Sequence, residues 1–345
     1  MPDLDSGRDE WSELAERAGN LFGTWEWATA WWRVYGDGQP LLTTICRDDS
    51  GRAVAILPLY LAMRRPVRVI RFVGHGAADQ LGPVCAPEDR GAAAEGLRAL
   101  LAERASRWDV LLAERLAPLD GWRELLGARV LHTEESPTLK IEGRRFDEFL
   151  ASRSRNFREQ VRRRRRKLER HRGPTFRLAD SESLGADLET LFRLHDARFA
   201  DGESSAFTGP RREFHRHFAR AALDRGWLRL WTLELDGEPA ASWYGFRFAG
   251  ADWYYQSGRD PRFDRDSVGF VLLSHTIEQA FDAGMSEYRL LRGGEEYKGR
   301  FASEDPGLET VALARGPRGR VAVRAALAAR SAPGGLRRRL RRLDQ

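Results

Sequence analysis

The stretch from Ala251 to Arg300 constrains the fold of this chain more than any other segment. An aromatic run at 251–257 is typical of a strand, and the apolar spacing within 267–283 is typical of a helix that faces a core. A short apolar run at 287–291 predicts another strand, which leads into a Gly-Gly turn. The segment therefore predicts a strand, a helix, a second strand and a turn in close succession.

The start of the predicted helix is a candidate site for an anion. Ser267 is a favourable N-cap residue, and Gly269 in the first turn lets another molecule approach the backbone closely. The first turn of a helix presents free N–H groups and the positive end of the helix dipole, which suit a phosphate. Every helix begins in this way, so the assignment also depends on the neighbouring residues.

Length and composition exclude several classes of protein. A chain of 345 residues can bury a full core, which predicts two domains or two halves. The sequence contains no apolar run of the length that spans a membrane, and its acidic N-terminus lacks the apolar region of a secretory signal. Cys46 and Cys85 have no metal-site spacing and indicate no disulfide framework. We therefore expect a globular, cytoplasmic protein without a bound metal.

Positive charge is concentrated in two segments. Residues 152–172 contain eleven Lys or Arg and two Glu, and residues 315–345 contain ten Arg and one Asp. The net charge of the whole chain is only +6, so the remaining residues are acidic in total. This pattern argues against a generally basic protein that coats nucleic acid and indicates two local basic surfaces.

The order of strand and helix signals predicts a mixed α/β fold. Two strands, a loop, a helix and a strand follow one another in 54–114 and again in 239–291, which predicts two copies of one fold joined by a basic helix. We expect strands at 138–141 and 308–314 to be the last of the N- and C-terminal halves. The predicted segments are an N-terminal half at 1–142, a basic connecting helix at 143–172, a C-terminal half at 173–316 and a basic tail at 317–345.

Several short motifs within residues 150–315 resemble one protein family. They are Leu194-His-Asp-Ala-Arg198, Gly202, Ser205, Ser257-Gly-x-Asp260, Ser267-Val-Gly269, Gly284, Tyr288-Arg-Leu-Leu-Arg-Gly293 and Glu296-Tyr-Lys298. Together with the order of elements, they resemble the GNAT acyltransferases, and more narrowly the CelD/BcsL-type acetyltransferases, which are related to the FemAB aminoacyltransferases. The resemblance implies two GNAT-like halves and transfer of an acyl group from acetyl-CoA or another acyl-CoA.

The same resemblance implies an acceptor amine or hydroxyl on a sugar or a peptide of envelope or exopolysaccharide biosynthesis. One alternative is a Fem-like aminoacyltransferase that uses charged tRNA, for which the basic helix would be a reason. Another is a non-catalytic, envelope-associated scaffold that retains the fold. We expect no sequence-specific binding of nucleic acid, because the sequence carries no RNA-binding signature. The oligomeric state is not indicated.

The resemblance places the acyl-CoA donor in a cleft where the strand 251–257 parts from the next parallel strand, 287–291, with its pyrophosphate at the start of the helix 267–283. The residues expected to bind it are Gln256, Ser257, Arg265, Ser267, Val268 and Gly269. Backbone N–H groups near Tyr255 are expected to polarise the thioester carbonyl. The usual phosphate loop, Gln/Arg-x-x-Gly-x-Gly/Ala, is absent, and two acidic residues, Asp264 and Asp266, are offset only by nearby arginines.

Four residues are candidates for the chemical step, and each has a structural alternative. His195 is either a general base or a hydrogen-bonded core residue, and Tyr255 or its neighbour Tyr254 is either the proton donor to the thiolate or a packing residue. Glu296 either faces the cleft or is an exposed loop carboxylate. Lys298 is one of three lysines beside 54 arginines, so we place it at the acceptor, with a surface lysine as the alternative. The residues expected to contact the acceptor are Arg198, Trp243, Tyr254, Arg292 and Glu295.

The two basic segments have different expected roles. The arginine run at 162–166 is either a binding surface for the phosphates of an acceptor, a membrane or tRNA, or a solvated helix face. In the tail, Leu336, Leu340 and Leu343 recur at helical spacing opposite arginines. This pattern predicts either peripheral contact with an anionic membrane or a disordered basic end.

Overall fold

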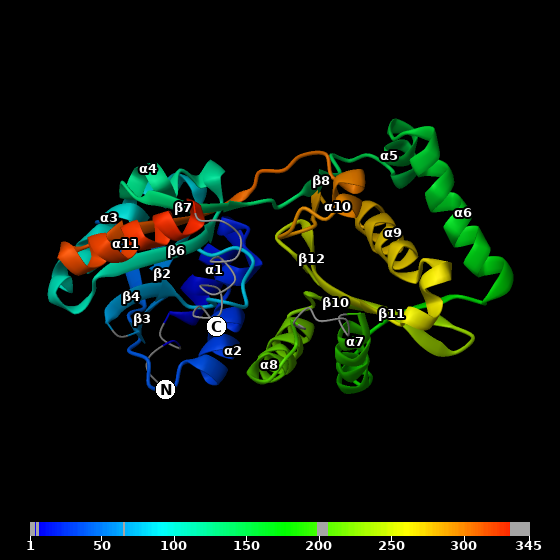
Figure 1. Cartoon of the computed structure of the whole chain (residues 1–345), viewed down its shortest axis with the longest axis horizontal. Coiled ribbons are helices and arrows are strands. Elements are labelled where there is room, and N and C mark those ends of the chain that lie inside the picture. The colour runs from blue at the N-terminus through cyan, green and yellow to red at the C-terminus, as the bar shows by residue number, and fades with distance from the viewer. Residues whose placement is uncertain (1–3, 5–6, 65, 199–205, 332–345) are drawn as a thin grey trace. The chain divides into compact units, whose positions relative to one another are not determined.

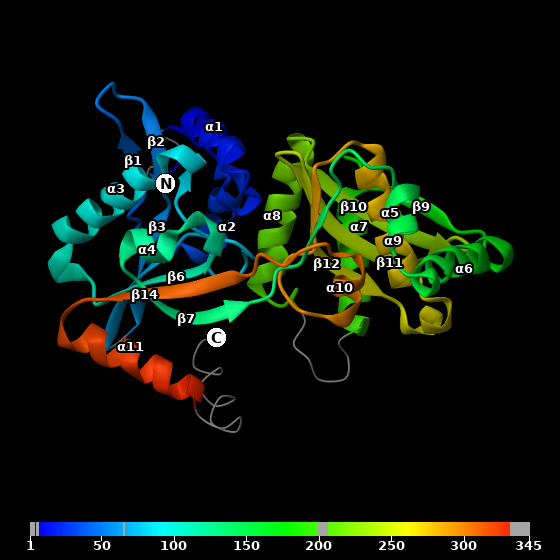
Figure 2. The same cartoon turned by 90° about the horizontal axis from the view of Figure 1, so that it is seen from above.

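The computed structural model describes residues 4, 7–64, 66–198 and 206–331 of the chain (Figure 1). The chain forms two compact units (Figure 1 and Figure 2). The first unit contains Met1–Glu134 and Pro306–Gln345, and the second contains Glu135–Asp305. The chain therefore passes from the first unit into the second and then returns to the first.

A six-stranded mixed sheet forms the centre of the second unit, in the order β8-β13-β12-β11-β10-β9. Its strands are β8 (Thr138–Lys140), β9 (Thr175–Leu178), β10 (Leu228–Leu235), β11 (Glu238–Phe248), β12 (Ala251–Arg259) and β13 (Glu287–Arg289). In this sheet β12 and β13 are parallel, and the other neighbouring strands are antiparallel. Strands β10 and β11 form the predicted hairpin, in which Asp236 and Gly237 both have positive φ angles of 53° and 81°, as a type I′ turn requires.

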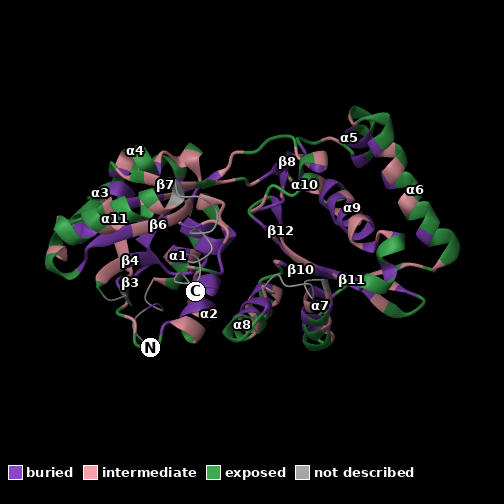
Figure 3. Cartoon of the chain, viewed as in Figure 1, coloured by how far each residue is buried: buried purple, intermediate pink, exposed green. Residues whose placement is uncertain are grey.

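Helices lie on both faces of this sheet (Figure 1). They are α5 (Phe146–Ser152), α6 (Arg155–His171), α7 (Leu184–Arg198), α8 (Pro210–Asp224), α9 (Val268–Asp282) and the short α10 (Glu296–Phe301). Buried residues of α5, α6 and α9 form one core with β10, β11 and β12. Helix α7 packs on β11 and β12. Figure 3 shows that the buried sides of these helices face the sheet, so the predicted mixed α/β fold is confirmed.

A five-stranded mixed sheet forms the centre of the first unit, in the order β3-β4-β6-β14-β7. Its strands are β3 (Leu59–Arg64), β4 (Val67–Phe72), β6 (Val110–Leu116), β7 (Arg129–Glu134) and β14 (Leu308–Ala314). A smaller sheet contains β1 (Thr44–Arg47), β2 (Ala53–Leu57) and β5 (Val84–Cys85). The helices of this unit are α1 (Arg8–Ala18), α2 (Trp25–Tyr35), α3 (Arg90–Glu103), α4 (Trp122–Leu126) and α11 (Gly316–Ser331).

The predicted repetition of elements is present in the two units. In the first unit, the parallel strands β4 and β6 are connected through α3, and in the second unit the parallel strands β12 and β13 are connected through α9. A strand that pairs antiparallel with the first of these parallel strands precedes it in each unit, β3 before β4 and β11 before β12. The two halves therefore share one order of elements, as the sequence pattern indicated.

Two strands lie outside the half in which the sequence analysis placed them. The strand at 308–314, expected to end the C-terminal half, is β14, which pairs with β6 and β7 in the first unit. The strand at 138–141, expected to end the N-terminal half, is β8, which pairs with β13 in the second unit. A strand pattern shows which side chains are buried but not which strand is the neighbour. The compact units therefore begin and end at other positions than the four predicted segments.

Removing β14 should unfold the first unit, because this strand lies between β6 and β7 and supplies the hydrogen-bond partners of both. A chain that ends at Asp305 should therefore lose protease resistance within residues 7–134 but keep the fold of residues 135–305. Limited proteolysis with mass spectrometry measures both. The control is a chain that ends at residue 331 and keeps β14 and α11. Equal protection of residues 7–134 in the two chains would show that β14 is dispensable.

Candidate active site

An irregularity in β12 shapes the candidate site. Tyr244 of β11 pairs with Gln256, whereas the next residue, Gly245, pairs with Tyr254, so Tyr255 is an extra residue in β12. Such a β-bulge bends the strand and interrupts the regular ladder. On its other side, β12 pairs with β13 only as far as Trp253. The two parallel strands therefore part at the bulge.

The bulge turns two hydroxyl side chains to the same face of the sheet. Residues three apart in a regular strand face opposite sides, but the extra residue brings Tyr254 and Ser257 together. Their hydroxyl oxygens lie 2.6 Å apart, within hydrogen-bond distance. Tyr297, the second residue of α10, donates a hydrogen bond of 3.4 Å to the Tyr254 hydroxyl. Three hydroxyl groups from two elements therefore form one chain, which we call the hydroxyl cluster (Tyr254, Ser257 and Tyr297).

The hydroxyl cluster rests on a buried aromatic layer. The ring of Trp243 stacks on Tyr254 with a centroid distance of 5.6 Å, and Trp243 itself is 2% exposed. Tyr288 of β13 lies beside Trp243, and its hydroxyl is 2.9 Å from the hydroxyl of Thr276 on α9. This packing fixes the plane of Tyr254. It also places Trp243, expected at the acceptor, beneath Tyr254 and away from solvent.

Tyr255 and His195 lie in the core between the sheet and the helices on its opposite face. Tyr255 packs on His215 of α8 at a centroid distance of 5.1 Å and on Tyr244. His195 is 1% exposed and packs on Phe207, so the structure brings it into this core and not to the hydroxyl cluster. Burial, together with the charges of Arg211 and His195, lowers the pKa of His215 to about 3, so its ring is neutral near pH 7.

Helix α9 begins without a side-chain cap. Ser267, predicted as its N-cap, has φ 57° and ψ 38°, and its side chain accepts no hydrogen bond from the helix. Its N–H group donates to the Asp264 carbonyl and so completes the preceding 3₁₀ turn at Pro261–Asp266, which explains the left-handed conformation. Gly269 has space beside its Cα, because an added Cβ would meet only the Arg259 Cδ at 3.6 Å. The first turn of α9 therefore remains available to a ligand.

The two acidic residues before α9 are neutralised within the second unit. Arg259 forms an ion pair with Asp264. Lys167 and Arg172 contact Asp266 at 2.8 Å and 3.6 Å, and Lys167 also donates to the Arg265 carbonyl. The side chain of Arg265 remains exposed. The charge expected to oppose a pyrophosphate is therefore offset, partly by residues of the basic segment 152–172.

Lys298 is buried, whereas the sequence analysis placed it either at the acceptor or at the surface. Its side chain is 5% exposed, and its ammonium donates to the carbonyls of Leu291 and Arg292 and contacts the Glu295 carboxylate at 2.9 Å. An ammonium has three donors, and these acceptors can use all of them. Leu291 and Gly293 have positive φ angles of 57° and 104°. Lys298 thus holds an unusual backbone turn after β13 and has no donor left over for an acceptor.

The remaining predicted residues are scattered around this turn or lie elsewhere. Gln256 and Arg292 are half-buried, Val268 is buried, and Glu296 is exposed. Arg198 is the last residue of α7, and its side chain lies outside what the structure describes. The motif residues Gly202 and Ser205 and residues 332–345 of the predicted tail also lie outside the described residues, whereas the first part of that tail, 317–331, lies in α11. The roles assigned to all of these residues stay predictions.

Tyr297 is the residue that the sequence analysis missed. It lies in the motif Glu296-Tyr-Lys298, in which only the charged residues Glu296 and Lys298 were candidates. The available signal was its place in this motif, shortly after the predicted strand 287–291; in the structure it is the second residue of α10. In the described ranges, no three His, Cys, Asp or Glu side chains are grouped so that they could hold a metal ion. No helix among the described residues is long and apolar enough to span a membrane.

The segment that contains β12, α9 and β13 matches a known domain family. Residues 155–299 match the model of a family described as an acetyltransferase (GNAT) domain. The matched range lies within the second unit, which therefore resembles a GNAT domain. The matched range begins at the first residue of α6 and includes the bulge, α9 and Lys298. The predicted resemblance to GNAT proteins is therefore confirmed at this level, and the narrower CelD/BcsL assignment stays a prediction. No curated protein matches the chain.

Solved structures show the same fold over most of the chain. FemX has a TM-score of 0.62 at 12% identity and aligns over 89% of this chain and 96% of its own. The C-terminal domain of a proposed lysylphosphatidylglycerol synthetase from Agrobacterium fabrum has a TM-score of 0.60 at 12% identity, over 94% of this chain and 95% of its own. L-PGS from Bacillus licheniformis has a TM-score of 0.53 at 13% identity, over 83% and 88%. At these identities the likeness shows the fold alone.

Replacing Lys298 by Met should destabilise the second unit, because the side chain keeps its length while the Leu291 and Arg292 carbonyls lose their donor. Hydrogen bonds to a charged group contribute about 1.5–3 kcal/mol, so we expect a loss of about 2 kcal/mol in the free energy of unfolding. Urea denaturation measures it. In the control, Glu295→Gln should cost less than about 1 kcal/mol, because Glu295 is 50% exposed. Equal stability of Lys298→Met and wild type would contradict the structural role.

Proposed function

We propose that the second unit transfers an acyl group from an acyl-CoA, with acetyl-CoA as the first candidate, to an amine or hydroxyl of a sugar or peptide. The observation that carries the proposal is the bulge at Tyr255, which gathers the hydroxyl cluster where β12 parts from β13. The match of residues 155–299 to an acetyltransferase domain supports the same class of reaction. We place the donor along this opening, with its pyrophosphate at the first turn of α9.

The proposed donor site uses the backbone more than side chains. The first N–H groups of a helix and its dipole favour a phosphate. The ion pairs of Asp264 and Asp266 remove the local charge that would oppose it. At the other end of the donor, backbone N–H groups at the bulge would stabilise the oxyanion that develops on the thioester carbonyl.

The hydroxyl cluster offers a path for a proton. When the acceptor attacks the thioester carbonyl, a bond forms to its nitrogen or oxygen, the C–S bond breaks, and the thiolate needs a proton. Tyr297 would donate this proton directly or through Tyr254, and the proton lost by the acceptor would pass to a base or to water. Glu296 is exposed beside Tyr297 and is our candidate for that base, because His195 is enclosed in a core on the other face.

An aminoacyl-tRNA donor is the second candidate, and one observation favours it. Arg162, Arg163 and Arg170 are exposed on α6, and within the described part of the chain their guanidinium groups form no ion pair. An exposed row of unpaired arginines suits a polyphosphate backbone. The fold of FemX and of the proposed lysylphosphatidylglycerol synthetase is compatible with this donor. The proposal also includes a cytoplasmic location and a role in envelope biosynthesis, in which the basic tail contacts the membrane.

Calorimetric titration with acetyl-CoA tests the donor site. Gly269→Asp should weaken binding by about tenfold or more, which is about 1.4 kcal/mol, because a carboxylate would face the pyrophosphate. Gly269→Ala is the matched control, because the Cβ fits and adds no charge. A parallel titration with charged tRNA separates the two donors. Binding of tRNA alone, or equal acetyl-CoA binding by Gly269→Asp and wild type, would contradict the proposed donor.

A second experiment tests the catalytic step with the variant Tyr297→Phe. The acceptor for this assay is found by screening amines and sugars against labelled acetyl-CoA. Removing the hydroxyl should leave the affinity for acetyl-CoA within about twofold of wild type and lower kcat by about 10²-fold, the scale of general acid catalysis. A colour assay for the released thiol measures the rate. An unchanged kcat would exclude Tyr297 as proton donor while leaving the donor site intact.

A further inference from the structure

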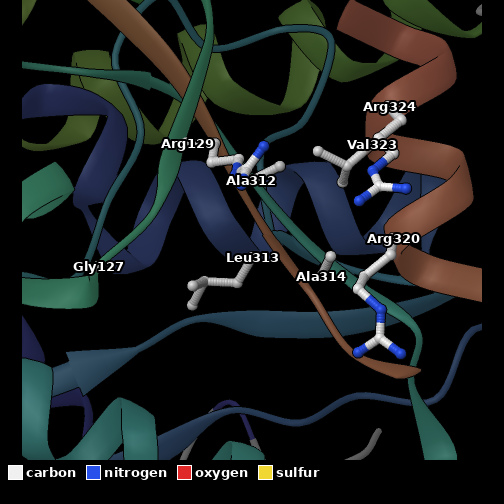
Figure 4. Close-up of a pocket in the computed structure, with 8 residues that line it drawn as sticks. All are labelled: Gly127, Arg129, Ala312, Leu313, Ala314, Arg320, Val323 and Arg324. Atoms are coloured by element: carbon white, nitrogen blue, oxygen red, sulfur yellow. The ribbon is translucent and has the colours of Figure 1, made fainter. Parts of the chain in front are cut away.

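A hollow lined by arginines lies in the first unit between β14, β7 and α11 (Figure 4). Its volume is ≈ 250 Å³. Arg129 of β7 and two arginines of α11, Arg320 and Arg324, line it, and no carboxylate does. Figure 4 shows that the three guanidinium groups approach β14 from the strand on one side and the helix on the other. We call this hollow, with its floor of Ala312, Ala314 and Val323, the arginine pocket.

The arginine pocket has space above its floor because the floor residues are small. Ala312 is the direct cross-strand partner of Arg129, so both side chains lie on the same face of the sheet. Ala312 also packs on Val323 of α11, while Ala314, two residues further along β14, is on that face as well. Alanine at these two positions leaves a space between α11 and β7 that a larger side chain would fill. The space therefore has an apolar floor and a positive rim.

The rim carries positive charge that no described residue neutralises. All three arginines are exposed, and in the ranges that the structure describes their guanidinium groups form neither an ion pair nor a hydrogen bond. Arg320 and Arg324 are four residues apart on one helix, where like charges repel each other and destabilise the helix. By contrast, the neighbouring acidic residue Asp109 is paired with Arg68. An anion bound between the three arginines would remove this repulsion.

The shape and charge together define the ligand class. Guanidinium groups bind phosphate oxygens in a planar, bidentate manner, so three of them around one space favour a phosphate over a monovalent anion. A volume of ≈ 250 Å³ lies just below the range of about 300–1,000 Å³ for drug-sized ligands, and therefore suits a small ester or a head group. The alanine and valine floor suits the carbon atoms attached to the phosphate.

We propose that the arginine pocket binds a phosphate ester, with the phosphate held by Arg129, Arg320 and Arg324 and the adjoining carbon atoms on Ala312, Ala314 and Val323. The ester is either a soluble metabolite or the head group of a phospholipid, since both present this chemistry. The pocket is built entirely from the first unit, whereas the proposed acyl transfer uses the second. The proposal therefore does not depend on the identity of the acyl donor.

Two measurements on the full chain test the proposal and separate the two sources. Calorimetric titration uses sn-glycerol 3-phosphate, and cosedimentation uses phosphatidylcholine vesicles with and without phosphatidylglycerol. The double variant Arg320→Gln/Arg324→Gln should weaken binding by about tenfold or more, because two charge-assisted contacts are lost. Arg129→Gln, from a different element, should weaken it too. The control Arg315→Gln/Arg318→Gln removes the same charge outside the pocket lining and should change binding by less than about twofold.

Each outcome decides a part of the proposal. Binding of glycerol phosphate that the pocket variants lose and the control keeps supports a soluble ester. Binding of the phosphatidylglycerol vesicles alone, with the same difference between variants, supports a lipid head group. An equal loss in the control would show that only total charge matters, and it would overturn the pocket. Absence of binding to both probes by the wild-type chain would overturn it as well.

Discussion

The register shift between β11 and β12 is the constraint on which the candidate site depends. One extra residue, Tyr255, places Tyr254 and Ser257 on the same face and turns Tyr255 to the other. It also falls where β12 ceases to pair with β13. Without the extra residue, strand alternation would place the two hydroxyl groups on opposite faces of the sheet. The bulge thus determines both the opening and the polar groups that line it.

The surrounding elements hold the bulged strand in place from both faces. On one face, Gly258 allows α7 to approach so closely that an added Cβ would lie 2.4 Å from the backbone nitrogen of His195. On the other, Trp243 stacks on Tyr254. The turn after β13, which carries Tyr297 to the cluster, depends on the buried ammonium of Lys298. The proposed proton transfer between hydroxyl groups would require a rigid support of this kind.

The sequence predicted the elements well and their neighbours less well. The Asp-Gly hairpin, α9 and the repeated order of strands and helices follow from local patterns, and the structure contains them. The partners of β8 and β14 depend on long-range pairing, which no local pattern encodes. The bulge was missed because Tyr254 and Tyr255 are both good strand residues and no glycine marks the irregularity. Lys298 was placed at the acceptor, with the surface as the alternative, because a lysine is rarely buried and its partners here are carbonyls that a sequence does not reveal.

Amide hydrogen exchange in the presence and absence of acetyl-CoA tests the central claim most directly, because it needs no known acceptor. If the donor lies along the opening of β12 and β13, exchange should slow at Tyr255–Ser257 and at the first turn of α9, Val268–Phe270. Protection confined to other segments, or no protection at saturating acetyl-CoA, would contradict the placement of the donor at the bulge.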